Sequence, residues 1–146
     1  MKIVLDTNVV VSGLIRPLDS APGALLDLWY QGRFDLVVSP GLVREYRLVL
    51  NRPKVRQWIR VPGFTARFLR HLEELATLVE APELDAVEVR DPKDRVVLAT
   101  AARGRANLVV TGDGDLLVLK AFQGIPILTP RAALARLGLP RDPRHS

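Results

Sequence analysis

The sequence contains no cysteine and only two histidines among its 146 residues. Without cysteine, disulfide bonds and thiolate metal sites are excluded. His71 falls in the middle of a predicted helix and His145 in the C-terminal tail, so the two cannot form a paired acid–base system. Any catalytic or metal-binding chemistry must therefore come mainly from carboxylates.

Long hydrophobic runs and several familiar enzyme motifs are also missing. No run approaches the roughly 20 apolar residues of a membrane span. The first six residues enter a predicted strand directly and lack the apolar region and cleavage site of a signal peptide, so we expect a cytoplasmic protein with no membrane partner. No nucleophile-elbow, P-loop or dinucleotide-binding glycine pattern is present.

Lysine is scarce, with four lysines beside 17 arginines, and the net charge of +5 is unevenly distributed. Residues 44–70 hold eight bases and a single acid, whereas residues 80–94 hold six acids and two bases. A basic segment beside an acidic cluster suits an enzyme that attracts a polyanion and cuts it at a metal. The alternative is a set of solvated helix faces in a protein from a GC-rich genome, which prefers arginine codons. Trp58 lies in the basic segment, and we expect it to pack rather than to stack on a base.

Short apolar runs alternate with helical patterns, which favours a parallel sheet with helices on both faces and right-handed crossovers. We predict a three-layer α/β/α fold in residues 1–138, with a flexible tail over residues 139–146. Strands are predicted over Lys2–Asp6, Leu36–Ser39, Ala76–Glu80, Leu108–Thr111 and Pro126–Leu128. Helices are predicted near residues 21–30, 40–50, 55–60, 63–75, 91–103, 113–121 and 130–137, several of them opening at a proline.

Two acids follow predicted strands directly. Asp6 ends the first strand, and Asp113 follows Leu108–Thr111 with glycines on both sides of it. Acids at the carboxyl ends of parallel strands can meet in one crevice. Each could instead cap the turn or helix that follows it. Secondary candidates beside them are Asn8, Thr111 and Asp115.

Two further acids are ambiguous on spacing alone. Asp94 belongs to Asp91-Pro92-Lys93-Asp94, which also reads as a capped helix start with Asp91 as the N-cap. Glu45 lies in the middle of a predicted helix among apolar and basic neighbours. Carboxylates gathered without a cation would repel one another. Their simplest shared use is to hold Mg²⁺ or Mn²⁺ through oxygen ligands.

Taken together, four segments resemble the motifs of a PIN domain, the metal-dependent ribonuclease fold of many VapC-like toxins in prokaryotic toxin–antitoxin systems. The segments are LDTNVVVSGL, SPGLVREYRLVLNRPKV, DPKDRVVLATAA and LVVTGDGDLL, in that order. The resemblance runs from residue 1 to about residue 137 and places Asp6, Glu45, Asp94 and Asp113 in the acid positions. It implies a five-stranded parallel sheet, a homodimer and one or two Mg²⁺ or Mn²⁺ ions.

The function that the resemblance implies is an endoribonuclease acting on single-stranded RNA, the toxin of a pair with a small antitoxin. Glu45 would bind the metal or act as the base. The RNA backbone is expected to meet basic side chains, namely Arg44, Arg47, Arg52, Lys54, Arg56 and Arg95. Two alternatives stay open: a non-catalytic nucleic-acid-binding or regulatory module, and another magnesium-dependent phosphoryl-transfer enzyme. A dehalogenase-type phosphatase would need a second aspartate where this chain has Asn8.

Overall fold

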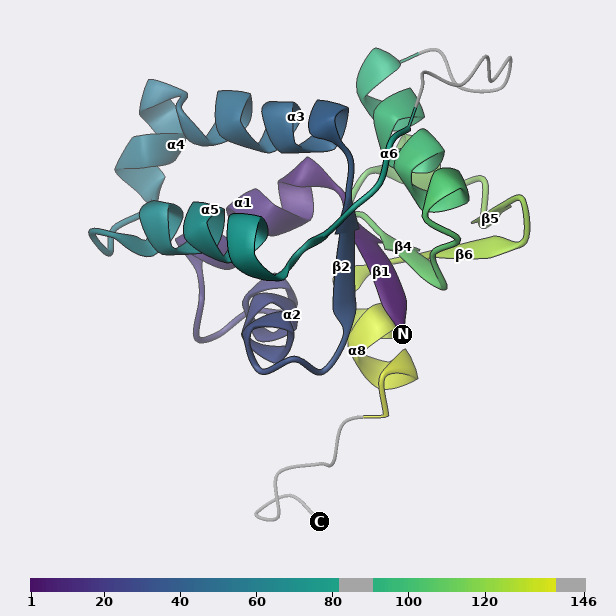
Figure 1. Cartoon of the computed structure of the whole chain (residues 1–146). Coiled ribbons are helices and arrows are strands. Elements are labelled where there is room, and N and C mark those ends of the chain that lie inside the picture. Colours follow the sequence, from purple (N-terminus) through teal and green to yellow (C-terminus); the bar gives the residue numbers. More distant parts are fainter. Residues whose placement is uncertain (82–90, 139–146) are drawn as a thin grey trace.

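The computed structural model describes residues 1–81 and 91–138, which build a mostly parallel sheet of six strands (Figure 1). The strand order is β3-β2-β1-β4-β6-β5. All neighbouring strands are parallel except the last pair, β5 and β6, which is antiparallel. The strands are β1 (Lys2–Leu5), β2 (Asp35–Val38), β3 (Thr77–Leu78), β4 (Leu108–Val110), β5 (Ala121–Phe122) and β6 (Ile125–Leu128).

The central strand β1 determines where the functional end of the sheet lies. It pairs in parallel with β2 on one side, Ile3 opposite Leu36, and with β4 on the other, Leu5 opposite Val110. Ile3, Val4 and Leu5 are fully buried, because helices cover both faces of the sheet. Since β1 and β4 run in the same direction, the residues that follow them emerge side by side at one edge.

Eight helices connect and cover these strands in the described part of the chain. The predicted starts at Ser-Pro, Asp-Pro and Thr-Pro are confirmed, since Ser39, Asp91 and Thr129 each accept a hydrogen bond from a backbone N–H of the first turn. The helices are α1 (Thr7–Ile15), α2 (Ala21–Tyr30), α3 (Pro40–Leu50), α4 (Pro53–Trp58), α5 (Phe64–Leu75), α6 (Pro92–Arg103), α7 (Gly114–Leu117) and α8 (Pro130–Arg136).

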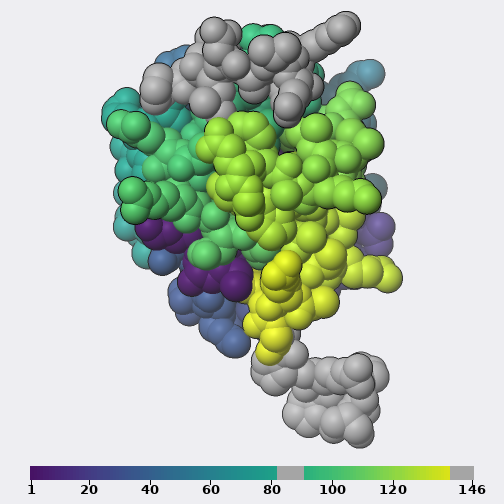
Figure 2. Space-filling view, turned by 90° about the vertical axis from the view of Figure 1, so that its right-hand side faces the viewer, coloured from purple at the N-terminus to yellow at the C-terminus, as the bar shows by residue number. Residues whose placement is uncertain are grey.

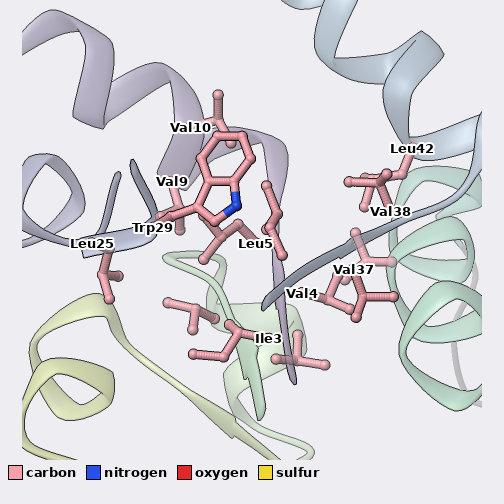
Figure 3. Close-up of a cluster of buried hydrophobic side chains, with 14 of the residues drawn as sticks. Ile3, Val4, Leu5, Val9, Val10, Leu25, Trp29, Val37, Val38 and Leu42 are labelled. Carbon is pink, nitrogen blue, oxygen red and sulfur yellow. The ribbon is translucent and has the colours of Figure 1, made fainter. Parts of the chain in front are cut away.

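The helices form two layers around the sheet. α6 packs on β1, β2 and β4, while α1, α2 and α5 lie on the opposite side of β1 and β2 (Figure 1). Trp29 of α2 lies next to Leu5, Val9 and Val10 in the main hydrophobic cluster (Figure 3). This arrangement confirms the predicted three-layer α/β/α fold.

One helix was absent from the prediction. Residues 7–15 form α1, although Val9, Val10 and Val11 are β-branched and have only modest helix propensity. Tertiary contacts override that preference, because α1 packs closely on α2. A Cβ added to Gly13 would lie 2.7 Å from Leu26 Cδ1, so only glycine allows this approach.

The predicted helix over residues 113–121 is wrong in its second half. α7 ends at Leu117, and Lys120 adopts a left-handed conformation with φ of 63°. The chain then forms a hairpin of β5 and β6, so the sheet has six strands rather than five. Figure 2 shows this end of the molecule, with the hairpin in yellow-green near α6 in green and α8 in yellow.

Two expectations concern residues outside the described part of the chain. These are the flexible tail, residues 139–146, and most of the acidic stretch, of which residues 82–90 are not described. Within the described residues, no helix has both the length and the apolar character needed to cross a membrane.

The contact between α6 and β2 generates a stability prediction at Gly104. This residue ends α6, and a Cβ there would lie 2.5 Å from Val37 Cγ1 and 3.1 Å from the Thr100 carbonyl oxygen. Val37 is buried and has a stiff β-branched side chain, so it cannot move aside easily. We expect Gly104→Ala to lower the free energy of unfolding by about 1–3 kcal/mol in urea titrations.

The control is Gly114→Ala, since nothing lies within 4 Å of the Cβ it would add. That variant should unfold near the wild-type midpoint. Equal stability of the two variants would show that α6 and β2 can separate without cost.

Candidate active site

Three carboxylates converge at the carboxyl edge of the sheet. Asp6 follows β1, Asp113 follows β4 after a two-residue turn, and Asp94 is the third residue of α6. One oxygen from each lies within 4.8 Å of an oxygen of the other two. Asp6 and Asp94 are buried, and Asp113 is half-buried. The parallel pairing of β1 and β4 brings the first two acids together, and α6 supplies the third.

Asp6 is held by hydrogen bonds on both carboxylate oxygens. Its Oδ1 accepts from the Thr7 backbone N–H at 2.7 Å, which caps α1. Its Oδ2 accepts from the Thr111 hydroxyl at 2.6 Å and from the Asn8 amide at 3.1 Å. The capping role and the site role expected for Asp6 are therefore compatible, because different oxygens face different partners.

Asn8 and Thr111 join the loop after β1 to the loop after β4. The Asn8 side-chain carbonyl accepts from the Gly112 N–H at 3.0 Å. The Thr111 hydroxyl, while donating to Asp6, accepts from the Asp113 N–H at 2.9 Å. These two secondary candidates thus position the acids and leave the centre of the cluster to the carboxylates.

The remaining secondary candidates lie at the margin. Asp91 is exposed and caps α6 by accepting from the Lys93 N–H at 3.0 Å. Asp115 is also exposed, and its backbone N–H donates to Asp113 Oδ1 at 2.9 Å. Neither carboxylate belongs to the converging group.

The cluster is electrostatically strained in the absence of a cation. Burial raises the pKa of Asp94 to about 6, with further repulsion from Asp113, Asp91, Asp6 and Asp115. Burial also raises the pKa of Asp6, although its hydrogen bonds from Thr111, Thr7 and Asn8 act in the opposite direction. Both shifts report carboxylates that are more easily kept neutral than usual.

Glu45 lies outside this group. It projects from the middle of α3 with its side chain 19% exposed, and its Oε1 lies 3.8 Å from Lys93 Nζ. A surface groove between α3 and α6 is lined by Arg44, Glu45, Leu48, Lys93 and their neighbours. The structure therefore places Glu45 beside the start of α6, the helix that carries Asp94.

The six basic residues predicted to contact RNA differ in their surroundings. Arg44, Arg52, Lys54 and Arg56 are exposed along α3 and α4, Arg95 is half-buried after Asp94, and Arg47 forms an ion pair with Glu73 at 3.2 Å. The expectation that Trp58 packs is wrong, because 53% of this residue is exposed. α4 is short and buries only Val55, which leaves Trp58 at the surface.

Tyr46 is a positioning residue that the sequence-based reasoning missed. Its hydroxyl donates to the carbonyl of Leu5, the residue before Asp6, and its side chain is fully buried. Burial raises the pKa of Tyr46 well above its usual value, with a smaller contribution from the Asp6 charge. The signal was available, since Leu42, Tyr46 and Leu50 repeat every four residues and a buried tyrosine hydroxyl needs a partner.

Comparison with known proteins identifies the family. The family model of the PIN domain matches residues 2–115, which include the three converging acids and Glu45. The chain therefore belongs to the PIN domain family. Among curated proteins it is similar to the uncharacterized protein MJ1680 of Methanocaldococcus jannaschii, with 28% identity over 120 residues, 82% of this chain and 76% of that protein.

Solved structures show the same fold at low sequence identity. The crystal structure of PAE2754 from Pyrobaculum aerophilum aligns with a TM-score of 0.60 and 20% identity, covering 94% of this chain and 90% of that chain. A chain in the crystal structure of VapBC2 from Rickettsia felis, which is bound to a DNA fragment from the VapBC2 promoter, aligns with a TM-score of 0.55 and 13% identity. The alignment covers 88% of this chain and 98% of that chain. The crystal structure of FitAcB from Neisseria gonorrhoeae aligns with a TM-score of 0.50 and 20% identity, covering 88% of this chain and 98% of that chain.

The raised pKa of Asp94 generates a prediction on pH and stability. An unfolded aspartate releases its proton near pH 3.9, whereas Asp94 in the folded protein holds it to about pH 6. Between these values the folded state binds more protons, so rising pH removes stability from the wild type. We expect Asp94→Asn, which cannot ionise, to gain stability relative to wild type as pH rises from about 4.5 to 7 in EDTA.

Urea unfolding at several pH values measures this difference. Asp19→Asn is the control, because the neighbouring Arg16 lowers the pKa of the exposed Asp19 and its contribution changes only below about pH 4. A constant difference between wild type and Asp94→Asn over the whole range would contradict the raised pKa.

Proposed function

We propose that this protein is a metal-dependent endoribonuclease that hydrolyses phosphodiester bonds in single-stranded RNA. The observation that carries the proposal is the convergence of Asp6, Asp94 and Asp113 within 4.8 Å at the carboxyl edge of the sheet. Membership of the PIN domain family supports it, because PIN domains are in general nucleases.

The donor set fits a hard divalent cation. Asp6, Asp94 and Asp113 offer carboxylate oxygens alone, which suit Mg²⁺ or Mn²⁺ rather than a metal that prefers nitrogen or sulfur. Burial, and after it repulsion from the neighbouring acids, raises the pKa of Asp94, and positive charge at the centre of the three carboxylates would favour its ionised form. We therefore infer that these three residues hold one or two such ions. When bound, the ion would lower the pKa of a water and offset charge on the scissile phosphate.

The remaining roles follow from position. Thr111 and Asn8 orient Asp6 through hydrogen bonds of 2.6 and 3.1 Å, so the orientation of the carboxylate is already fixed when a cation binds. Glu45, whose Oε1 lies 3.8 Å from Nζ of Lys93, the residue before Asp94, is the group proposed to accept a proton from the attacking water or to extend the ligand set. Arg44 beside it would contact an RNA phosphate.

We further propose that the protein is the toxin of a toxin–antitoxin pair, acting in the cytoplasm as a homodimer. Structural likeness to chains in VapBC2 and FitAcB supports an antitoxin partner. The antitoxin would cover the acidic cluster and thereby block access of RNA to it.

The first test of this function replaces one charge of the cluster. Asp6→Asn keeps the shape and the N-cap of α1, because asparagine caps about as well as aspartate. Because it removes a charge from the centre, we expect a fall of roughly 10²-fold or more in Mn²⁺-dependent cleavage of single-stranded RNA, comparable to losing a positioned catalytic group. Cleavage should also stop in EDTA. Expression of the wild type should slow growth of a test host, and Asp6→Asn should relieve that.

The matched control is Asp91→Asn, which alters an exposed helix cap outside the converging group. It should cleave RNA at close to the wild-type rate. Wild-type cleavage by a folded Asp6→Asn protein would reject the assignment. RNA binding without any cleavage would instead favour a non-catalytic nucleic-acid-binding module.

A second test measures metal binding without substrate. A ligand that binds only the folded state stabilises it by about 2.7 kcal/mol at a hundred times its dissociation constant, so saturating Mn²⁺ should raise the melting temperature of the wild type. Asp113→Asn removes repulsion and should melt at or above wild type in EDTA, yet gain much less from Mn²⁺. Calorimetry or dye-based melting with and without Mn²⁺ measures both effects. A full metal response in Asp113→Asn would mean that Asp113 is only the cap of α7.

A further inference from the structure

The segment around α4 is strongly positively charged. From residue 46 to residue 72 the chain has no acid and seven arginines and lysines. Arg47 pairs with Glu73, and Arg67 lies over the Tyr30 ring at 4.7 Å. The other five have no acidic partner within ion-pair distance among the described residues, and all five are exposed: Arg52, Lys54, Arg56, Arg60 and Arg70.

An exposed tryptophan, Trp58, lies among these basic residues. Trp58 is 53% exposed, whereas Trp29, the other tryptophan of the chain, is 2% exposed. Arg56 and Arg60 lie two residues to either side of Trp58, and both are exposed. Exposing so large an aromatic side chain forgoes the free energy of burial, which points to a ligand that covers it.

The chemistry of the surroundings distinguishes between possible ligands. An apolar protein surface would leave the neighbouring cations without counter-charges. A single-stranded nucleic acid offers both a flat base for the indole ring and phosphates for the guanidinium groups. Its recognition by cationic grooves with exposed aromatic platforms is sequence-tolerant, because every base has a stacking face.

The position of α4 connects this surface to the acidic cluster. The hydroxyl of Ser39, the N-cap of α3, lies 2.7 Å from that of Thr100 on α6, and the eleven residues of α3 lead to α4 (Figure 1). A helix of that length spans about 16 Å. Arg44 and Leu48 line the groove along the way, on the side of α3 that faces α6. RNA leaving the cluster along α3 would therefore reach α4 after several nucleotides.

We propose that Trp58 stacks on an unpaired base of the RNA substrate, with Arg56 and Arg60 contacting the adjacent phosphates. This inference rests on the proposed ribonuclease function and adds a substrate-binding position remote from the reacting bond. Trp58 acts in binding, so its loss should raise KM while kcat stays within about twofold of the wild type.

The experiment uses the fluorescence of the protein itself. A ten-nucleotide oligouridylate is titrated into the cleavage-deficient Asp6→Asn protein at low salt. Trp29 is shielded in the core, so quenching on binding reports Trp58. Adding Trp58→Ala should weaken binding about tenfold and abolish the quenching, whereas Trp58→Phe should retain most of the affinity. Arg56→Gln should reduce the slope of log affinity against log salt by about 0.7.

Two controls match these changes elsewhere on the surface. Leu18→Ala removes an apolar side chain that is 97% exposed in the α1–α2 connection, and Arg131→Gln removes an exposed cation of α8. Both should bind RNA as the parent does. Unchanged affinity in Trp58→Ala, or binding without quenching, would overturn the role of Trp58 even if RNA cleavage by the wild type is intact. Binding with quenching would support Trp58 even if no cleavage is found.

Discussion

The hydrogen bond from the Thr111 hydroxyl to Asp6 Oδ2, 2.6 Å long, is the contact on which the site depends. It joins the residue after β1 to the residue after β4 and is buried. The same hydroxyl accepts the Asp113 N–H, so one side chain aligns two of the three acids. Without that link the carboxylates would be free to move apart under their mutual repulsion. The fold thus holds the acids together through neutral hydrogen-bonding groups.

Holding like charges together lowers the stability of the folded state, and helix N-termini beside the acids offset part of this cost. Asp6 caps α1, Asp113 caps α7 and Asp94 lies in the first turn of α6, so each acid is close to the positive end of a helix. Tyr46 adds a buried hydrogen bond to the carbonyl of Leu5 and steadies the end of β1. From sequence alone, each of these acids could either cap a helix or belong to the site. In the structure the two roles coexist, because a carboxylate has two oxygens.

The fold could be predicted well where the local signals agreed with the tertiary structure. Apolar runs located the five parallel strands β1, β2, β3, β4 and β6 to within two residues, and Ser-Pro or Asp-Pro pairs located the helix starts. α1 could not be predicted from its valine-rich sequence, because packing on α2 decides its conformation. The hairpin of β5 and β6 was missed because Lys120 adopts a left-handed conformation that lysine rarely takes.

The sequence predicted which acids form the site but only part of how they are positioned. Spacing placed Asp6 and Asp113 at strand ends, and the family resemblance was needed to select Asp94 over its neighbour Asp91. The packing of α3 on α6 could not be predicted from sequence, so the position of Glu45 beside the start of α6 and outside the three converging acids required the structure. Tyr46 and Thr111 show the same limit, since their roles depend on which backbone or side-chain group lies opposite them. The prediction that Trp58 packs in the core is wrong, because α4 is too short to bury it.

The short edge strands of the sheet limit how copies of this chain can associate. In the described part of the chain, the outermost strands β3 and β5 are two residues long each, so they offer few unpaired backbone groups. Short borders of this kind resist the edge-to-edge pairing by which β-proteins aggregate. Among the described residues, pairing of sheet edges is therefore a poor route for this protein to assemble with itself, and the paired strands of one copy offer little backbone to another.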